Sequence, residues 1–204
     1  MDQMNYELRE GQGDNVLVLL HGTGGDKTSL MELAKYIDDD AVLVGIEGDV
    51  MEQGMRRYFA RYADGSFDLE SLAKHTTRLY ETIERIMQEH DLGPHNINLL
   101  GYSNGANIAV NLLKTYETAY KGAFLFHPSA GRLGVPFKPQ PRMRVLLTSG
   151  DNDPYITQAE FEQLTLELED AEIRHEALVH SSGHSLIRNE LDQARRMLED
   201  MQDA

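Results

Sequence analysis

The segment INLLGYSNGANIA, residues 97–109, decides the fold class of this chain. Residues 97–100 form an apolar run that suits a strand buried on both faces, and the turn Gly101-Tyr102-Ser103-Asn104-Gly105 leads into small residues that suit a helix. In this G-x-S-x-G arrangement the serine lies on a sharp turn above the sheet, and the glycines let strand and helix approach closely. The alternative is a glycine-rich turn with an incidental serine. The strand before the turn and the small residues after it favour Ser103 as a nucleophile.

Short apolar runs alternate with segments of helical spacing along the rest of the chain. The runs that predict strands are residues 16–20, 41–46, 97–100, 123–126, 145–148 and 173–179. The segments that predict helices are residues 28–36, 69–86, 105–116, 157–169 and 185–201, and Asp68 is placed to cap the second of them. This alternation shows no domain boundary and predicts one α/β domain over residues 1–204, with a mostly parallel sheet flanked by helices. Active residues of such sheets gather at the carboxyl ends of the strands.

The composition excludes several classes of function. Lys and Arg total 19 against 34 for Asp and Glu among 204 residues, which gives a net charge of −15. Such a surface repels phosphate backbones and anionic lipids, so we expect neither a nucleic acid nor a membrane as a partner. The absence of cysteine excludes disulfides, thiolate catalysis and Cys-ligated zinc. Residues 1–15 are polar and lack the apolar stretch of a signal peptide, so we expect a cytoplasmic protein, with a homodimer left open.

Two loops after later strands offer the base and the acid that a serine nucleophile needs. Asp151 and Asp153 follow one predicted strand, and His180 and His184 follow the next, which gives the chain order Ser, Asp, His of this kind of site. Aspartates in such turns also often bond only to nearby backbone amides. We expect Asp153 to be the acid and His184, at the entrance to the last predicted helix, to be the base.

The spacing of His180 and His184 would also suit two metal ligands on a helix. Gly183 interrupts that stretch, which is predicted to be a loop, and no third ligand completes a metalloprotease arrangement. We therefore expect no metal.

The loop His21-Gly22-Thr23-Gly24-Gly25 follows the first apolar run. A tetrahedral oxyanion needs two N–H donors, one after the nucleophile and one from a loop after an early strand. We expect the backbone N–H groups of Asn104 and Thr23 to form this oxyanion hole. The loop also looks like a phosphate cradle, but a Walker A motif needs glycines at positions 21 and 26, and a dinucleotide fingerprint needs one at position 27. Neither motif is complete, so no cofactor is expected.

These motifs together resemble an α/β-hydrolase of the small carboxylesterase and phospholipase-type family, over nearly the whole chain. The residues that carry the resemblance are His21-Gly22-Thr23-Gly24-Gly25, Gly101-Tyr102-Ser103-Asn104-Gly105, Gly150-Asp151-Asn152-Asp153-Pro154 and Gly183-His184. Within that family the chain is most similar to the hydroquinone-linked carboxylesterases, through GDVMEQGMRRYF at residues 48–59, Phe67-Asp68 and Ala106-Asn107-Ile108-Ala109. The resemblance implies the nucleophile, acid and base already named, and the same two oxyanion donors. The acyl-protein thioesterase branch has Gln after the nucleophile, where this chain has Asn104.

The expected activity is hydrolysis of small soluble carboxylic esters through a Ser-His-Asp triad and an acyl-enzyme intermediate. The alternatives are an acyl-thioesterase or lysophospholipase with the same triad, or a non-catalytic ligand-binding protein of the same fold. The connections at residues 47–67 and 127–142 are too short for a large cap domain, which indicates an open pocket. The candidates for lining that pocket are Tyr58, Phe59, His127 and Tyr155. The segment that holds Tyr58 and Phe59 could equally be a packed loop, and His127 could equally serve only to shape a loop.

Overall fold

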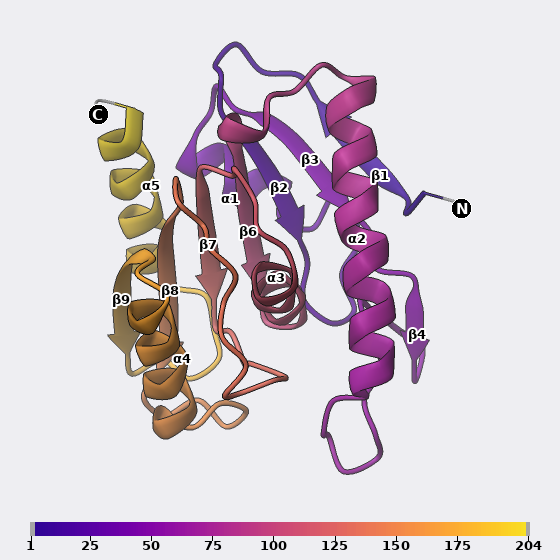
Figure 1. The fold of residues 1–204 in the computed structure, drawn as a ribbon, viewed down its shortest axis with the longest axis vertical. Helices are drawn as coiled ribbons and strands as arrows, with labels where there is room; N and C mark the ends of the chain where they lie inside the picture. Colours follow the sequence, from indigo (N-terminus) through magenta and orange to yellow (C-terminus); the bar gives the residue numbers. More distant parts are fainter. Residues whose placement is uncertain (1–2, 203–204) are drawn as a thin grey trace.

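The computed structural model describes residues 3–202 and shows one sheet with helices on both of its faces (Figure 1). Seven strands form the sheet in the order β1-β3-β2-β6-β7-β8-β9, and β1 alone runs antiparallel to its neighbour. Their bounds are β1 Tyr6–Arg9, β2 Val16–Leu20, β3 Val42–Ile46, β6 Ile97–Tyr102, β7 Gly122–Phe126, β8 Arg144–Gly150 and β9 Arg174–His180. The mostly parallel sheet predicted from the apolar runs is confirmed.

Five α-helices of the described chain cover the sheet. They are α1 Met31–Ile37, α2 Leu69–Glu89, α3 Asn104–Thr115, α4 Gln158–Asp170 and α5 Arg188–Gln202. Helices α2, α3 and α4 pack on one face, and α1 and α5 pack together on the other (Figure 1). All five predicted helices are present, with ends shifted by a few residues.

Strand β2 shows why the apolar runs are continuous. Val16, Val18 and Leu20 belong to the core under α2 and α3, while Leu17 and Leu19 belong to the core under α1 and α5. Successive side chains of a strand point to opposite faces of the sheet. Because both faces are covered by helices, every position of the strand is buried and apolar.

Helix α2 forms on the side-chain pattern that predicts it. The Asp68 carboxylate accepts a hydrogen bond from the Ser71 backbone N–H at 3.1 Å and so caps the helix start. Leu72, Leu79 and Ile83 are each at most 1% exposed, and they lie on the helix face that packs against the sheet. The amphipathic spacing therefore fixes both the helix and the face that it buries.

Three short strands and one helix start differ from the sequence expectations. β1 is an edge strand of half-exposed residues, and β4 Val50–Glu52 and β5 Met55–Arg57 form a separate hairpin of three residues on each side. None of these carries an apolar run. The first helix begins at Met31 rather than residue 28, because the Asp26 side chain accepts the Thr28 N–H at 2.8 Å in a turn that precedes it.

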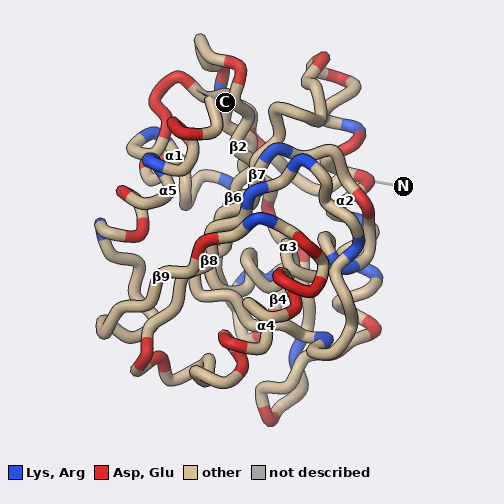
Figure 2. The backbone as a smooth tube through the Cα atoms, turned by 60° about the vertical axis from the view of Figure 1, so that its left-hand side comes forward, with Lys and Arg blue, Asp and Glu red and all other residues tan. Residues whose placement is uncertain are grey.

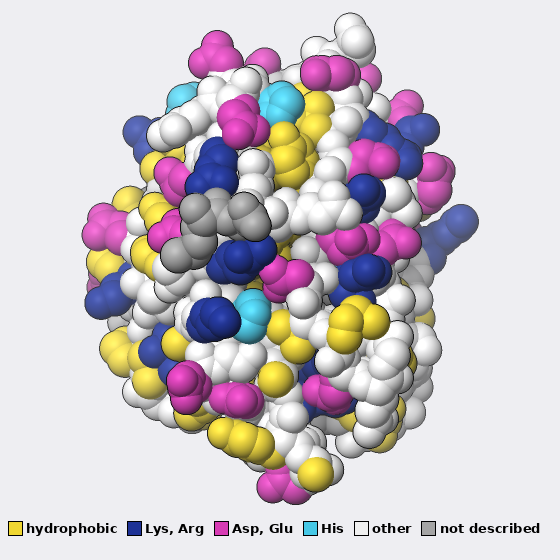
Figure 3. All heavy atoms as spheres, turned by 90° about the vertical axis from the view of Figure 1, so that its right-hand side faces the viewer, with side chains coloured by type: hydrophobic (Ala, Val, Ile, Leu, Met, Phe, Trp, Pro, Cys, Tyr) yellow, Lys and Arg dark blue, Asp and Glu magenta, His cyan; other side chains and the backbone are white. Residues whose placement is uncertain are grey.

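Neither long connection builds a cap domain over the described residues. Residues 47–68 contain the β4–β5 hairpin, and residues 127–143 contain only turns. No helix in the described part of the chain is long and apolar enough to cross a membrane. On the side of the molecule seen in Figure 3, charged side chains of both signs are interspersed with small apolar groups.

Candidate active site

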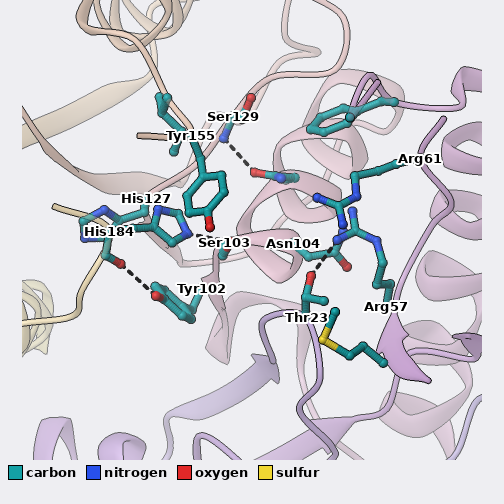
Figure 4. A pocket seen from close by; sticks show the side chains of 15 residues that line it. Thr23, Arg57, Arg61, Tyr102, Ser103, Asn104, His127, Ser129, Tyr155 and His184 are labelled. Carbon is teal, nitrogen blue, oxygen red and sulfur yellow. Dashed lines mark hydrogen bonds between the residues drawn. The ribbon is translucent and has the colours of Figure 1, made fainter. Parts of the chain in front are cut away.

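The Ser103 backbone is held in a conformation that an ordinary residue avoids. Ser103 follows β6 directly and has φ +53° and ψ −114°, in the half of backbone space that favours glycine. Helix α3 starts at the next residue, so the side chain stands between the end of a strand and the start of a helix. This geometry turns the hydroxyl of Ser103 into a pocket above the carboxyl ends of the strands (Figure 4).

Two glycines make this turn sterically feasible. A Cβ on Gly105 would lie 2.0 Å from the Leu20 carbonyl oxygen, and a Cβ on Gly101 would lie 2.7 Å from the Ala106 backbone nitrogen. Both distances are shorter than any non-bonded contact allows. Helix α3 can therefore approach β2 and β6 this closely only with glycine at both positions.

A chain of hydrogen bonds runs from the serine into the protein. Ser103 Oγ lies 2.8 Å from His184 Nε2, and His184 Nδ1 lies 2.6 Å from Asp153 Oδ2. A carboxylate oxygen only accepts, so His184 donates through Nδ1 and its Nε2 is free to accept the serine proton. The structure thus brings together the three residues that the sequence nominates from three separate loops.

The environment of Asp153 keeps it ionised. Its side chain is completely buried, and burial alone raises the pKa of a carboxyl group. Hydrogen bonds from the His184 ring, from the Tyr155 backbone N–H at 2.8 Å and from the His127 ring outweigh that effect and lower the pKa of Asp153. Asp153 is therefore a buried carboxylate that faces His184.

The competing acid and base lie elsewhere. Asp151 is exposed, and its carboxylate accepts a hydrogen bond from the Ser181 hydroxyl at 3.0 Å. His180 Nε2 lies 3.2 Å from Glu190 Oε2 and 3.4 Å from His127 Nε2. Among the described residues, neither Asp151 nor His180 makes a hydrogen bond or an ion pair with Ser103 or His184.

The His184 loop is fixed on both sides. The Tyr102 hydroxyl donates to the backbone carbonyl of His184 at 2.7 Å, and the Tyr155 ring meets the imidazole edge-on at 5.0 Å between centroids. Tyr155 is 73% exposed and forms an outer wall of the pocket, as the sequence predicts. Tyr102, the residue before Ser103, also lines the pocket, and the sequence patterns did not single it out.

The loop after β2 lies across Ser103 from His184 (Figure 4). Thr23 and Asn104 both line the pocket, and no described residue accepts a hydrogen bond from either backbone N–H. His21 holds the loop, because its Nδ1 meets the Gly22 carbonyl at 2.7 Å and its Nε2 accepts the Gly48 N–H at 3.0 Å. Burial lowers the pKa of His21 below its ordinary value, so this imidazole is neutral.

Tyr58 and Phe59 do not line the pocket, contrary to the sequence expectation. Both are fully buried. The Tyr58 hydroxyl accepts the His21 N–H at 3.0 Å and donates to the Ile46 carbonyl at 2.5 Å, and its backbone N–H donates to Asn104 Oδ1 at 2.7 Å. Tyr58 therefore joins the loop after β2 to the start of α3. The aromatic residues at positions 58 and 59 belong to the core, so the packed-loop alternative holds for them.

His127 lies at the end of β7 and borders the pocket, but its ring is tied to buried carboxylates. Its Nδ1 lies 3.2 Å from Asp153 Oδ2 and its Nε2 lies 2.8 Å from Glu190 Oε1, and all three side chains are fully buried. Burial by itself lowers the pKa of His127, but the two carboxylates outweigh it and raise the pKa. Carboxylate oxygens only accept hydrogen bonds, so both ring nitrogens of His127 donate, and this geometry favours the charged imidazolium between the two anions. The sequence analysis missed Glu190, which lies in α5 without any motif around it.

The cluster of His127, His180 and Glu190 has the composition of a metal site, and its ligand atoms all lie within 4.8 Å of one another. The hydrogen bonds of this cluster favour protonated nitrogens over a bound metal ion. The Ser182 N–H donates to His180 Nδ1 at 3.0 Å, which places the ring proton on the Nε2 that a metal would need. The Glu190 oxygens already accept hydrogen bonds from the Thr148 hydroxyl at 2.6 Å and the Ile187 N–H at 2.7 Å.

The pocket has a volume of about 350 Å³. Met55, Arg57 and Arg61 line the pocket from the segment 55–62, which the sequence offered either as a pocket wall or as a packed loop. The lining residues that sequence reasoning did not place there are Gly65, Phe67, Tyr102, Asn107, Ser129 and Ile156. Most come from the connection after β3 or from single positions next to the motifs. Their positions in the chain carry no periodic signal, because the fold alone brings these loops together.

The chain resembles proteins of known class over nearly its full length. A family model described as Phospholipase/Carboxylesterase matches residues 7–202. The protein named "Putative hydrolase MhqD" from Bacillus subtilis (strain 168) is 38% identical over 192 residues, which are 94% of this chain and 96% of that protein. The crystal structure of the Bacillus cereus carboxylesterase matches with a TM-score of 0.93 at 38% identity and covers 97% of this chain and 94% of that one. The carboxylesterase from Mesorhizobium loti matches with a TM-score of 0.88 at 26% identity and covers 95% of this chain and 93% of that one.

The buried cation predicts a pH-dependent stability. Replacing His127 by Gln leaves Asp153 and Glu190 buried without their shared positive partner, and we expect the free energy of unfolding to fall by about 3 kcal/mol near pH 6. Because the folded pKa of His127 is raised above its unfolded value, its contribution is present below the unfolded pKa and is lost as pH rises through the folded pKa.

Urea denaturation of both proteins from about pH 6 to about pH 10 checks this expectation. The difference in stability between wild type and His127→Gln should shrink as pH rises. Exposed His95 serves as the control, since His95→Gln should change stability little at any pH. A difference for His127→Gln that stays constant with pH would contradict a charged His127.

Proposed function

Because this chain belongs to the phospholipase/carboxylesterase family, we propose that it is a serine hydrolase that cleaves small carboxylic esters with Ser103 as nucleophile, His184 as base and Asp153 as acid. The observation that carries the proposal is the continuous hydrogen-bond chain from Ser103 Oγ through both nitrogens of His184 to Asp153. The proposal treats residues 1–204 as one α/β-hydrolase domain, in keeping with a family match over residues 7–202.

Acylation begins when Ser103 Oγ attacks the ester carbonyl carbon while His184 Nε2 takes the serine proton. Buried Asp153 stabilises the imidazolium that forms and keeps the ring in the tautomer with Nδ1 protonated. The tetrahedral intermediate places a negative oxygen beside the backbone N–H groups of Thr23 and Asn104. As this intermediate collapses, the alcohol leaves with the proton from His184, and the acyl group stays on Ser103.

In deacylation, water replaces Ser103 as the nucleophile and His184 again acts as the base. His184 Nε2 takes a proton from a water molecule, whose oxygen attacks the acyl carbon, and the same two backbone N–H groups stabilise the second oxyanion. Collapse returns the proton to Ser103 and releases the carboxylic acid. Both oxyanion donors are fixed before substrate binds, because Tyr58 joins their two loops.

The size of the pocket supports a small substrate. Its volume of about 350 Å³ is near the lower end for small-molecule sites, which run from roughly 300 to 1,000 Å³. Over the described residues no cap domain extends the pocket to enclose a long acyl chain. Ile156, Phe67 and Met55 supply the apolar part of the lining.

Ser103→Ala tests the nucleophile. We expect kcat for a p-nitrophenyl ester to fall by at least about 10³-fold with the fold intact, since only binding and oxyanion stabilisation remain. A fluorophosphonate probe followed by peptide mapping should label Ser103 in the wild type and nothing in the variant. Exposed Ser182→Ala is the control and should keep wild-type activity. Retention of more than about a tenth of wild-type kcat in purified Ser103→Ala would falsify the proposal.

The two aspartates of the loop after β8 give a matched pair of variants. Asp153→Asn should lower kcat by at least about 10³-fold, because an amide facing Nδ1 disturbs the tautomer that leaves Nε2 free. Asp151→Asn should change kcat only slightly, because that side chain is exposed and bonds to Ser181. Circular dichroism on both variants controls for folding. The reverse ranking would show that Asp153 is not the acid.

A series of p-nitrophenyl esters of increasing acyl length tests the substrate size. We expect kcat/KM to be highest for short acyl chains, and the rate to show no jump when the ester passes its solubility limit. Interfacial activation requires a lid or an apolar docking face. A maximum at long acyl chains would contradict the small, open pocket.

A further inference from the structure

One wall of the pocket is positively charged. Arg57 and Arg61 lie across Ser103 from His184, with their guanidinium groups side by side above Thr23 (Figure 4). No Asp or Glu of the described residues lines this pocket. Elsewhere acidic positions are spread over the helices and loops (Figure 2), in keeping with the net charge of −15. The pocket wall therefore has the opposite sign to the molecule as a whole.

The nearby carboxylate neutralises one of these arginines. Glu52 Oε1 accepts hydrogen bonds from Arg61 Nε at 3.1 Å and from Arg61 Nη2 at 2.8 Å. Arg57 Nε lies 3.7 Å from Glu52 Oε2, beyond hydrogen-bonding distance. Two guanidinium groups thus share one carboxylate, and the positive charge left over belongs mainly to Arg57.

Arg57 is held rigidly with donors to spare. Its side chain is only 3% exposed, its Nε donates to the Phe59 carbonyl at 3.1 Å, and its Nη1 donates to Thr23 Oγ1 at 2.6 Å. Nη2 has no hydrogen-bond partner among the described residues. Burial and the charge of Arg61 lower the pKa of Arg57 to about 10, against the opposing effect of Glu52. A fixed, desolvated guanidinium of this kind gains from an anion that completes its hydrogen bonds.

We propose that Arg57, assisted by Arg61, is an anion subsite of the pocket and that the preferred substrates are esters with a second group that is a free carboxylate. The carboxylate accepts hydrogen bonds from Arg57 while the ester carbonyl lies at Ser103. Met55 and Phe67 line the same pocket and contact the carbon chain between the two groups. This inference rests on the proposed function and adds the chemical class of the substrate to it.

Arg57 also has a structural role that the test must separate. Its hydrogen bond to Thr23 Oγ1 holds the loop whose backbone N–H is a proposed oxyanion donor. If Arg57 acted only by positioning Thr23, its loss would slow the hydrolysis of every ester by the same factor. A charge subsite instead acts on anionic esters selectively and mainly through KM.

The experiment compares anionic and neutral esters in two pairs, because the carboxylate could belong to either half of the ester. The first pair is 4-acetoxybenzoate and methyl 4-acetoxybenzoate, which differ in the leaving alcohol. The second is monomethyl glutarate and methyl butyrate, which differ in the acyl group. We expect Arg57→Gln to lower kcat/KM for the anionic ester of at least one pair about tenfold more than for its neutral partner, the loss of a hydrogen bond to a charged group.

Three further variants separate a charge effect of Arg57 from a positioning effect. Arg56→Gln is the matched control, because Arg56 does not line the pocket, and it should leave the anionic-to-neutral ratio unchanged. Thr23→Val removes the hydroxyl that Arg57 holds and should affect both esters of a pair equally. Glu52→Gln removes the negative partner and should raise the ratio above that of the wild type. Added salt should lower the wild-type ratio by screening the charge.

Each outcome either supports or overturns the anion subsite. Equal losses on both esters of each pair in Arg57→Gln would assign Arg57 to positioning alone and overturn the anion subsite. If circular dichroism shows that Arg57→Gln is unfolded, an unchanged ratio in Glu52→Gln overturns the proposal and a raised ratio supports it. Ser103-dependent hydrolysis of the neutral esters preserves the proposed function in either case. Hydrolysis that survives Ser103→Ala would instead overturn the proposed function itself.

Discussion

The close approach of helix α3 to strands β2 and β6 is the constraint on which the rest of the site depends. Gly101 and Gly105 permit this approach, and no larger residue fits at either position. The approach forces Ser103 into its strained backbone conformation, and no residue of the described chain accepts the backbone N–H of Asn104 at the start of the helix. The same packing brings Asn104 Oδ1 to the backbone N–H of Tyr58. One packing contact therefore positions Ser103, the backbone N–H of Asn104 and the neighbouring loop that holds Tyr58.

Burial of charge shapes the opposite side of the site. Asp153 and Glu190 are both fully buried, which is costly for carboxylates unless each is paired and hydrogen-bonded. His127 supplies the positive charge between them, and backbone N–H groups and the Thr148 hydroxyl satisfy the remaining oxygens. Contacts other than the one to His184 therefore also hold the Asp153 carboxylate in place. This support keeps the carboxylate ionised in a place where water cannot reach it.

The connection between β3 and α2 both packs into the core and lines the pocket. Tyr58 and Phe59 are buried in the core, and the Tyr58 hydroxyl holds the loop after β2, while Arg57 and Arg61 line the pocket. Arg57 donates from Nε to the carbonyl of buried Phe59, and Arg61 donates to Glu52. The rigidity that the aromatic residues give to this segment is what allows a buried guanidinium to be presented at a fixed position beside Ser103.

The sequence by itself determined the mostly parallel α/β sheet and the order of its main strands and helices along the chain. It also singled out Ser103, Asp153 and His184, which the fold joins in one chain of hydrogen bonds. Buried parallel strands and amphipathic helices leave periodic patterns, and the strained turn requires glycines at fixed spacing. Tertiary structure alone decided that Tyr58 is a core brace, that Glu190 and His127 lie behind Asp153, and that Arg57 faces the pocket. These contacts join residues distant in the chain, and no local periodicity or spacing records which long-range neighbours a side chain meets once the loops are packed.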